Sequence, residues 1–161
     1  IDMVMDFLAP SEPEVKKFTK APWKILIVDD EGSVRNLAIS SLERNGFRVV
    51  AAADAEEGLV RLDHDNDIDL IVVDLEMPGF HGIEVLEAIR LRRPQLPVLL
   101  CSTSPDGIPA GVFEPGLTAF LAKPYGADQL NAAVGDLARS SLEVQMTGRR
   151  RQAAGGATSS F

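Results

Sequence analysis

Several features are scarce or missing in this 161-residue chain, and each excludes a class of protein. A single cysteine, Cys101, excludes an intramolecular disulfide bond and fits a reducing cytoplasm, where we expect the protein to reside. No apolar run approaches the roughly 18 residues of a membrane span, so we expect no membrane association. The amino terminus has neither the basic leader of a secretory signal nor an initiator methionine. We therefore expect a processed or excised piece.

Basic residues are also in the minority, with 16 Lys and Arg against 24 Asp and Glu and a net charge of −8. Nucleic-acid binding needs a basic footprint, so we expect no specific nucleic-acid binding by this chain. A hydrophobic content of 45% and a mean hydropathy of +0.05 indicate a globular protein of one domain. We place that domain at residues 22–142, after an extension or linker at 1–21. A flexible, basic and disordered tail is expected at 143–161, with arginines at 149–151.

Short apolar segments recur along the chain at intervals that each admit one helix. Several are β-branched and lack polar alternation, which is typical of strands buried on both faces of a parallel sheet. The pattern therefore predicts an α/β fold, a doubly wound (βα)5 parallel sheet. The predicted strands are residues 25–28, 47–52, 70–73, 98–101 and 118–121. The predicted helices are residues 33–45, 54–62, 83 to just before Pro94, and a last one containing Leu130, Val134 and Leu137.

Local signals place the helix ends. Ser33 is expected to cap the first helix, whose buried face would include Leu37, and Gly46 to end it. Asp54 followed by Glu57 resembles a capping box for the second helix. Residues 104–116 hold three prolines and three glycines, so we expect the helix between the last two strands to be shortened or irregular.

Carboxylates and a lysine follow the predicted strands. Asp29 and Asp30 end the first strand, Asp74 the third, Ser102 the fourth, and Lys123 the fifth. The carboxyl ends of parallel strands meet at one edge of a sheet, where crowded carboxylates repel by on the order of a kcal/mol or more per pair. A hard cation such as Mg²⁺ would relieve that repulsion. A lone strand-end aspartate could also be a solvated strand terminator, but together these residues predict a magnesium-assisted phosphoryl acceptor.

Four blocks resemble the signature sequences of bacterial two-component response-regulator receiver domains of the chemotaxis-regulator type. They are residues 25–31, 72–82, 97–103 and 120–125, in the family's order, and the likeness spans residues 23–141. The resemblance implies a flavodoxin-like sheet with strand order 2-1-3-4-5. It also implies a cytoplasmic phosphoprotein of phosphorelay signal transduction, which catalyses only its own phosphorylation and dephosphorylation and is otherwise no enzyme.

The resemblance assigns the acceptor and the metal ligands. Asp74 would take a phosphoryl group from the phosphohistidine of a histidine kinase. Asp30 would bind Mg²⁺ directly, Asp29 mostly through water, and Asp74 and the backbone carbonyl of Glu76 would complete the protein ligands. The partners implied are a sensor histidine kinase or phosphotransfer protein and a downstream protein target, with a homodimer possible.

The resemblance also assigns a switch. Lys123, followed by a cis peptide to Pro124, would pair with the phosphoryl oxygens. Ser102 would move to hydrogen-bond them, and Phe120 would sit at the aromatic switch position. The chain departs from the family in having Thr103 where Ala or Gly is usual and Phe120 where Tyr is more common. The irregular 104–116 segment weakens inference about the face that many relatives use to dimerise.

Two other functions compete with a receiver. An aspartate-nucleophile phosphatase also uses a strand-end Asp with Mg²⁺, but it needs a second acid two residues later, which Glu76 supplies only by charge. A flavodoxin-like flavin binder would need a phosphate cradle after the first strand, where Asp29 and Asp30 would repel a phosphate. Whether the chain was excised from a larger regulator or hybrid kinase stays open.

Overall fold

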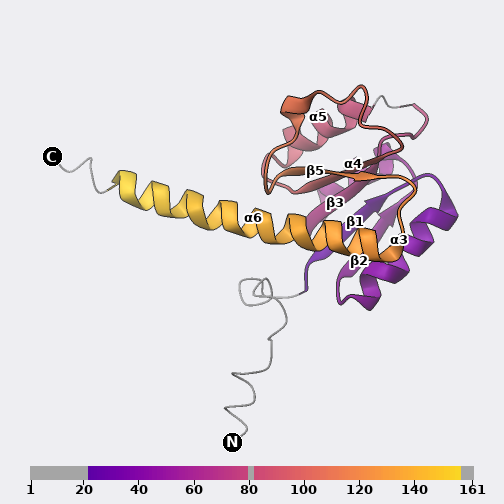
Figure 1. The fold of residues 1–161 in the computed structure, drawn as a ribbon, viewed down its shortest axis with the longest axis horizontal. Coiled ribbons are helices and arrows are strands. Elements are labelled where there is room, and N and C mark those ends of the chain that lie inside the picture. Colours follow the sequence, from indigo (N-terminus) through magenta and orange to yellow (C-terminus); the bar gives the residue numbers. More distant parts are fainter. Residues whose placement is uncertain (1–21, 80–81, 157–161) are drawn as a thin grey trace, which may run out of the picture.

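The fold is described from a computed structural model, which covers residues 22–79 and 82–156. The predicted extension at 1–21 lies outside the described residues. Strands and helices alternate along the chain (Figure 1). The elements are β1 (Lys24–Val28), α3 (Gly32–Arg44), β2 (Arg48–Ala52), α4 (Ala55–His64), β3 (Ile68–Asp74), α5 (Gly82–Arg92), β4 (Val98–Ser102), the 3₁₀ turn η1 (Ala110–Val112), β5 (Thr118–Ala122) and α6 (Ala127–Gly156).

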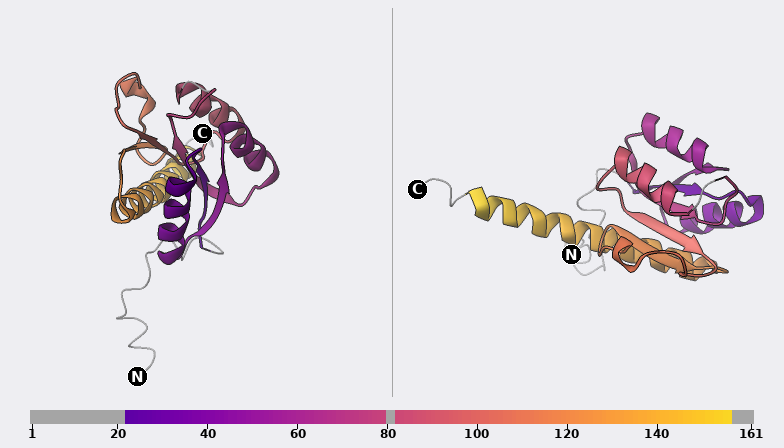
Figure 2. Two further views of the ribbon diagram at one scale, coloured as in Figure 1. Left: turned by 90° about the vertical axis from the view of Figure 1, so that its right-hand side faces the viewer. Right: turned by 90° about the horizontal axis from the view of Figure 1, so that it is seen from above.

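The five strands form one parallel sheet in the order β2-β1-β3-β4-β5, which confirms the predicted topology. Helices α4 and α5 pack on one face of the sheet, and α3 and α6 pack on the other (Figure 2). Side chains of β1, β3 and β4 alternate between these two hydrophobic clusters, so the central strands are buried on both sides. This explains why their sequences are continuously apolar.

The helix starts follow local hydrogen bonding. Asp54 Oδ1 accepts from the Glu57 N–H at 2.7 Å, and Glu57 Oε2 accepts from the Ala53 N–H at 3.0 Å, so the predicted capping interaction is confirmed. The prediction that Ser33 caps α3 is wrong, because the helix already begins at Gly32 with Glu31 at the cap position and no side-chain cap bond. Asp29 Oδ1 accepts from the Glu31 N–H at 2.9 Å, which fixes the loop before Ser33.

The other end of α3 agrees better with its sequence. Gly46 follows the helix with φ of 92°, a backbone conformation that glycine adopts without strain, so the predicted stop is confirmed. The buried face of α3 holds Ala38, Ser41 and Leu42, whereas Leu37 is 47% exposed. Leu37 was wrongly placed on the core face.

The segment between β4 and β5 contains only the single 3₁₀ turn η1, which confirms the predicted loss of a regular helix there. Val112 and Phe113 from this segment still pack against the core. Arg90 of α5 donates to the backbone carbonyls of Leu96 and Leu117, at 2.5 and 2.9 Å. The guanidinium therefore holds the start of β5 near α5 without a covering helix.

The last helix differs most from its prediction. Helix α6 continues through Gly156 and projects beyond the sheet (Figures 1 and 2), so the expectation of a disordered tail is wrong for residues 143–156. A helix nucleated on the core extends at little cost through residues of good helix propensity, which are common in this segment. The division into a domain and a tail at residue 142 stays a prediction. Within the described ranges, no helix is both long and apolar enough to cross a membrane.

Candidate functional site

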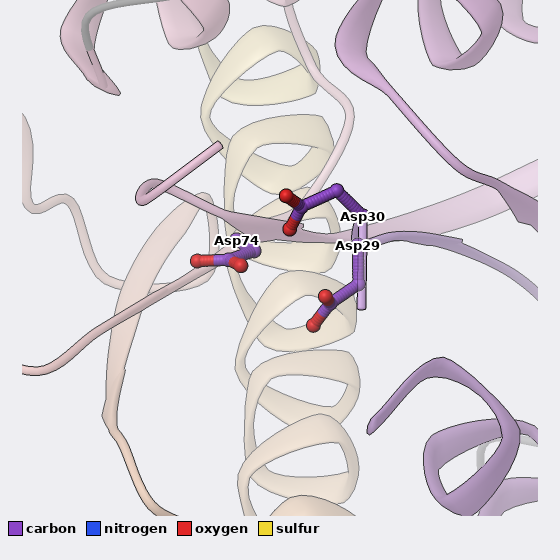
Figure 3. Close-up of side chains that lie close together, drawn as sticks. All are labelled: Asp29, Asp30 and Asp74. Atoms are coloured by element: carbon purple, nitrogen blue, oxygen red, sulfur yellow. The ribbon is translucent and has the colours of Figure 1, made fainter. Parts of the chain in front are cut away.

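Three carboxylates converge where β1 and β3 end side by side in the sheet (Figure 3). Oxygen atoms of Asp29, Asp30 and Asp74 all lie within 4.8 Å of one another. Asp29 and Asp74 are buried, at 3% and 4% exposure, while Asp30 is exposed. The structure thus brings together the acidic residues that the sequence placed at this edge.

The acidic cluster is electrostatically unfavourable without a cation. Burial raises the pKa of Asp29, and the charges of Asp74 and Asp30 raise it further. The hydrogen bond from the Glu31 N–H and the charge of Lys123 lower this pKa, but they do not outweigh the other effects. Arg35 of α3 reaches this loop and donates from Nη1 to the backbone carbonyl of Asp29 at 2.8 Å. That contact was missed from the sequence, because an arginine in a first helical turn carries no positional signal.

The lysine after β5 reaches the same cluster. Lys123 Nζ lies 3.0 Å from Asp74 Oδ2, and the Lys123 N–H donates to the Ser102 carbonyl at 2.9 Å, which aligns the ends of β4 and β5. Burial acts to lower the pKa of Lys123, but its hydrogen bond to Asp74 and the nearby acidic charges outweigh burial and raise that pKa. The Lys123–Pro124 peptide is cis, as predicted.

The second oxygen of Asp74 is also held. Asp74 Oδ1 accepts from the Glu76 N–H at 2.9 Å, so both carboxylate oxygens have a donor. The Glu76 side chain crosses toward β4, where its Oε1 accepts from Ser102 Oγ at 3.0 Å and from the Thr103 N–H. These bonds from Thr103 and Ser102 lower the pKa of Glu76. This side-chain position could not be predicted from the sequence, because Glu76 stands in an exposed loop.

The donor set fits a hard divalent cation. Mg²⁺ prefers oxygen ligands, takes one or two carboxylates and keeps several waters, which suits two buried carboxylates and an exposed one. Cys101 precedes Ser102 on β4, but burial raises its pKa to about 12, so a thiolate does not compete as a soft ligand.

The predicted aromatic switch residue, Phe120, lies on β5, the strand next to β4 with its Ser102. Phe120 of β5 is half-buried, and its ring meets that of Phe113 edge to face, with centroids 6.3 Å apart and an interplanar angle of 75°. Phe113 belongs to the irregular segment, so an aromatic contact joins β5 to the region that lacks a helix.

Comparison with known proteins agrees with this geometry. The family model described as the response regulator receiver domain matches residues 25–135. The alkaline phosphatase synthesis transcriptional regulatory protein PhoP of Bacillus subtilis is 34% identical over 119 residues, covering 73% of this chain and 49% of that protein. The chain thus spans about half the length of such curated relatives.

Solved structures match over nearly their whole length. Chemotaxis response regulator CheY4 of Vibrio cholerae is 29% identical, with a TM-score of 0.65 over 73% of this chain and 99% of that one. Response regulator TrrA of Thermotoga maritima, solved in complex with Mg²⁺ and BeF, is 28% identical, with a TM-score of 0.62 over 71% of this chain and 98% of that one.

Proposed function

The chain belongs to the response regulator receiver domain family, and we propose that Asp74 is the residue on which it accepts a phosphoryl group. A receiver is a phosphoacceptor in two-component signalling rather than an enzyme with turnover. The observation that carries the assignment is the 3.0 Å contact between Lys123 Nζ and Asp74 Oδ2 beside two further carboxylates. A buried, cation-paired carboxylate at a strand end is a positioned nucleophile.

The proposed chemistry is a single group transfer. An Asp74 oxygen forms a bond to phosphorus while the P–N bond of a phosphohistidine breaks, and the electron pair of that bond stays on the imidazole nitrogen. Lys123 then faces the new phosphoryl oxygens as a counter-charge. Ser102 supplies a hydroxyl donor to the same group, since it ends the neighbouring strand.

The acidic triad is typical of a Mg²⁺ site, and in this proposal Asp30, Asp29, Asp74 and the Glu76 backbone carbonyl hold the ion. Bound Mg²⁺ supplies positive charge that neutralises the carboxylates and the transferred group. Asp30 is the exposed member of the triad, which makes it the accessible ligand for an ion arriving from solvent.

Receiver domains interact with histidine kinases, and we infer that a sensor kinase or phosphotransfer protein is the donor and that a protein target reads the phosphorylated state. We also infer a cytoplasmic location.

The test is chemical phosphorylation followed by intact-mass and peptide mass spectrometry. Acetyl phosphate with Mg²⁺ is expected to add one phosphoryl group to the wild type and none to Asp74→Asn. Labelling that persists in Asp74→Asn, or that is insensitive to EDTA, would contradict the assignment. Hydrolysis of p-nitrophenyl phosphate with turnover would instead support a phosphatase.

A further inference from the structure

The side chain of Glu76 accepts hydrogen bonds from two donors next to the strand that carries Asp74. One carboxylate oxygen, Oε1, accepts from the hydroxyl of Ser102 at 3.0 Å and also from the Thr103 N–H. Ser102 is the last residue of β4 and Thr103 follows it, and β4 is the strand next to the one that carries Asp74. An anionic oxygen is therefore already bound where a strand-end hydroxyl and a backbone N–H converge.

These two donors are the ones that a phosphoryl oxygen on Asp74 would use. Asp74 pairs in register with Cys101, so Ser102 and Thr103 are the next donors along β4 beyond the acceptor. Lys123 is already paired with Asp74 and follows β5, which lies beyond β4 in the sheet. A phosphoryl group adds three acceptor oxygens, and the Glu76 carboxylate competes with one of them for Ser102 and Thr103.

We propose that the Glu76 carboxylate competes with the phosphoryl group for the Ser102 hydroxyl and the Thr103 N–H. Glu76 must release these two donors before they can bind the transferred group. This inference rests on the proposed role of Asp74 as acceptor. Glu76 thereby lowers the rate at which the domain accepts a phosphoryl group and the affinity for phosphoryl mimics. It does so through its side chain alone, so its backbone carbonyl stays in place as a proposed metal ligand.

The local hydrogen bonds allow such an exchange. The Ser102 hydroxyl has one proton but two acceptors in reach, Glu76 Oε1 and the Ser104 carbonyl, each at 3.0 Å. The Ser104 N–H donates back to Ser102 Oγ at 3.3 Å, so the loop holds this hydroxyl even when Glu76 leaves. Glu76 itself is exposed and can turn into water without burying its charge.

Three substitutions distinguish competition for the Ser102 and Thr103 donors from simple repulsion between the Glu76 charge and the phosphoryl group. Glu76→Ala removes both the charge and the reach of the side chain. Glu76→Asp keeps the charge but is one methylene shorter, so it cannot span to both donors. Glu76→Gln removes the charge but keeps an acceptor oxygen of the same reach. Glu87→Gln, on the exposed surface of α5, is the control for loss of one negative charge elsewhere.

The first measurement involves no phosphorylation. In metal-free protein, the Thr103 amide proton should resonate downfield in the wild type, as expected for a bond to a carboxylate, and should move upfield in Glu76→Ala and Glu76→Asp. Glu76→Gln should move it less, and Glu87→Gln should leave it unchanged. An unmoved Thr103 amide in Glu76→Ala would overturn the inference.

The second measurement compares rates of labelling by acetyl phosphate with Mg²⁺ and affinities for beryllofluoride with Mg²⁺. Glu76→Ala and Glu76→Asp should both gain roughly two- to tenfold, the range expected for releasing exposed charge-assisted bonds. Glu76→Gln should gain less. A gain in Glu76→Gln equal to that in Glu76→Ala, with none in Glu76→Asp, would mean that charge alone acts and would overturn the inference.

The two hypotheses fail differently in these experiments. Absence of any label on Asp74, in the wild type and in every Glu76 variant, would refute the proposed function. Label on Asp74 at equal rates in the wild type and in Glu76→Ala would leave the function intact and refute the role of Glu76.

Discussion

Lys123 Nζ and Asp74 Oδ2 lie 3.0 Å apart, with side chains that are only 15% and 4% exposed. The contact crosses one intervening strand, because β4 separates β3 from β5 in the sheet. One cation therefore offsets a buried carboxylate that has two acidic neighbours.

Breaking this pair from the lysine side should be costly. Lys123→Met leaves Asp74 buried beside Asp29 without its cation, and we expect the free energy of unfolding to fall by roughly 1–3 kcal/mol in metal-free buffer, below the usual cost for a fully buried pair. Adding Asp74→Asn should recover most of that loss, because the uncompensated charge is removed. Urea unfolding of the two single variants and the double variant measures the coupling.

Arg139→Met serves as the comparison, because its pair with Asp136 is exposed on α6. That substitution should change the unfolding free energy by less than about 0.5 kcal/mol. Equal losses in Lys123→Met and Arg139→Met would show that the Lys123–Asp74 contact contributes no more than a surface pair.

Magnesium alone should stabilise the fold. The raised pKa of Asp29 reflects burial and acidic neighbours, and a bound cation removes that penalty only in the native state. We expect a gain on the order of one to a few kcal/mol at saturating Mg²⁺. Thermal melts with and without Mg²⁺ should show the shift in the wild type and in Asp136→Ala. An undiminished shift in Asp30→Ala would place the ion elsewhere.

Acid stability should depend on a pair at the opposite end of the sheet. Lys24 Nζ lies 2.5 Å from Asp65 Oδ2, and this hydrogen bond lowers the pKa of Asp65. A lowered native pKa means that the stabilisation is complete above the ordinary value of 3.8 and is lost as the pH falls through the native value. Asp65→Asn should cost roughly 0.5–1 kcal/mol at pH 7 and little below pH 3.

Urea unfolding from pH 7 to pH 2.5 measures this difference. Asp63→Asn is the matched variant, since its ion pair with Arg92 is more exposed than the pair of Lys24 with Asp65. A difference between Asp65→Asn and wild type that stays constant down to pH 2.5 would contradict the linkage.

The sequence predicted most of the sheet and the acidic cluster for one physical reason. Apolar runs identify strands buried on both faces, and parallel strands bring Asp29 and Asp74 to one edge regardless of helix details. The start of α3 could not be predicted as well, because the Asp29 bond to the Glu31 N–H is a contact made by the folded loop. The position of the Glu76 side chain depends on donors from a strand that follows it in the chain.

The length of α6 was missed for a different reason. Composition alone suggested a flexible tail, but the helix is already nucleated by the packing of Leu130, Val134 and Leu137. Contact with the turn before β5 then extends that packing. A Cβ built on Gly116 would lie 2.6 Å from the Ser140 carbonyl oxygen and 2.9 Å from Val144 Cγ2. Such contacts between distant segments leave no periodic signal in the sequence.

Coupling of the site to the surface can be tested at Phe120. Its ring is half-buried and meets Phe113 edge to face, a contact worth about 0.5–1.5 kcal/mol beyond area burial in other proteins. Phe120 has no hydroxyl, so a change of its position costs no hydrogen bond. In the predicted switch, the ring would move into space vacated near β4, and its packing on Phe113 opposes that move.

Ser102 is the group whose movement would create that vacancy. Its hydroxyl contacts Glu76 Oε1 and the Ser104 carbonyl in the absence of phosphate, and a phosphoryl group on Asp74 would draw it toward the acceptor. Ser102→Ala should still accept phosphate on Asp74, because Lys123 and the Thr103 N–H remain, but it should lose most of the response at Phe120. The measurement is the chemical-shift change around Phe120 on adding beryllofluoride with Mg²⁺.

Phe113→Leu is the complementary variant, because it weakens the packing that holds Phe120 without touching the site. We expect it to keep the full shift at Thr103 while moving the Phe120 resonances toward their beryllofluoride-bound positions even before the ligand is added. Burial of a phenyl ring contributes roughly 1.5–3 kcal/mol. Loss of the edge-to-face contact with Phe113 is therefore large enough to change how often the Phe120 ring occupies each of its two positions. A full wild-type response at Phe120 in Ser102→Ala would instead identify Thr103 or another donor as the moving group, since the ring would then respond to phosphoryl binding without the Ser102 hydroxyl.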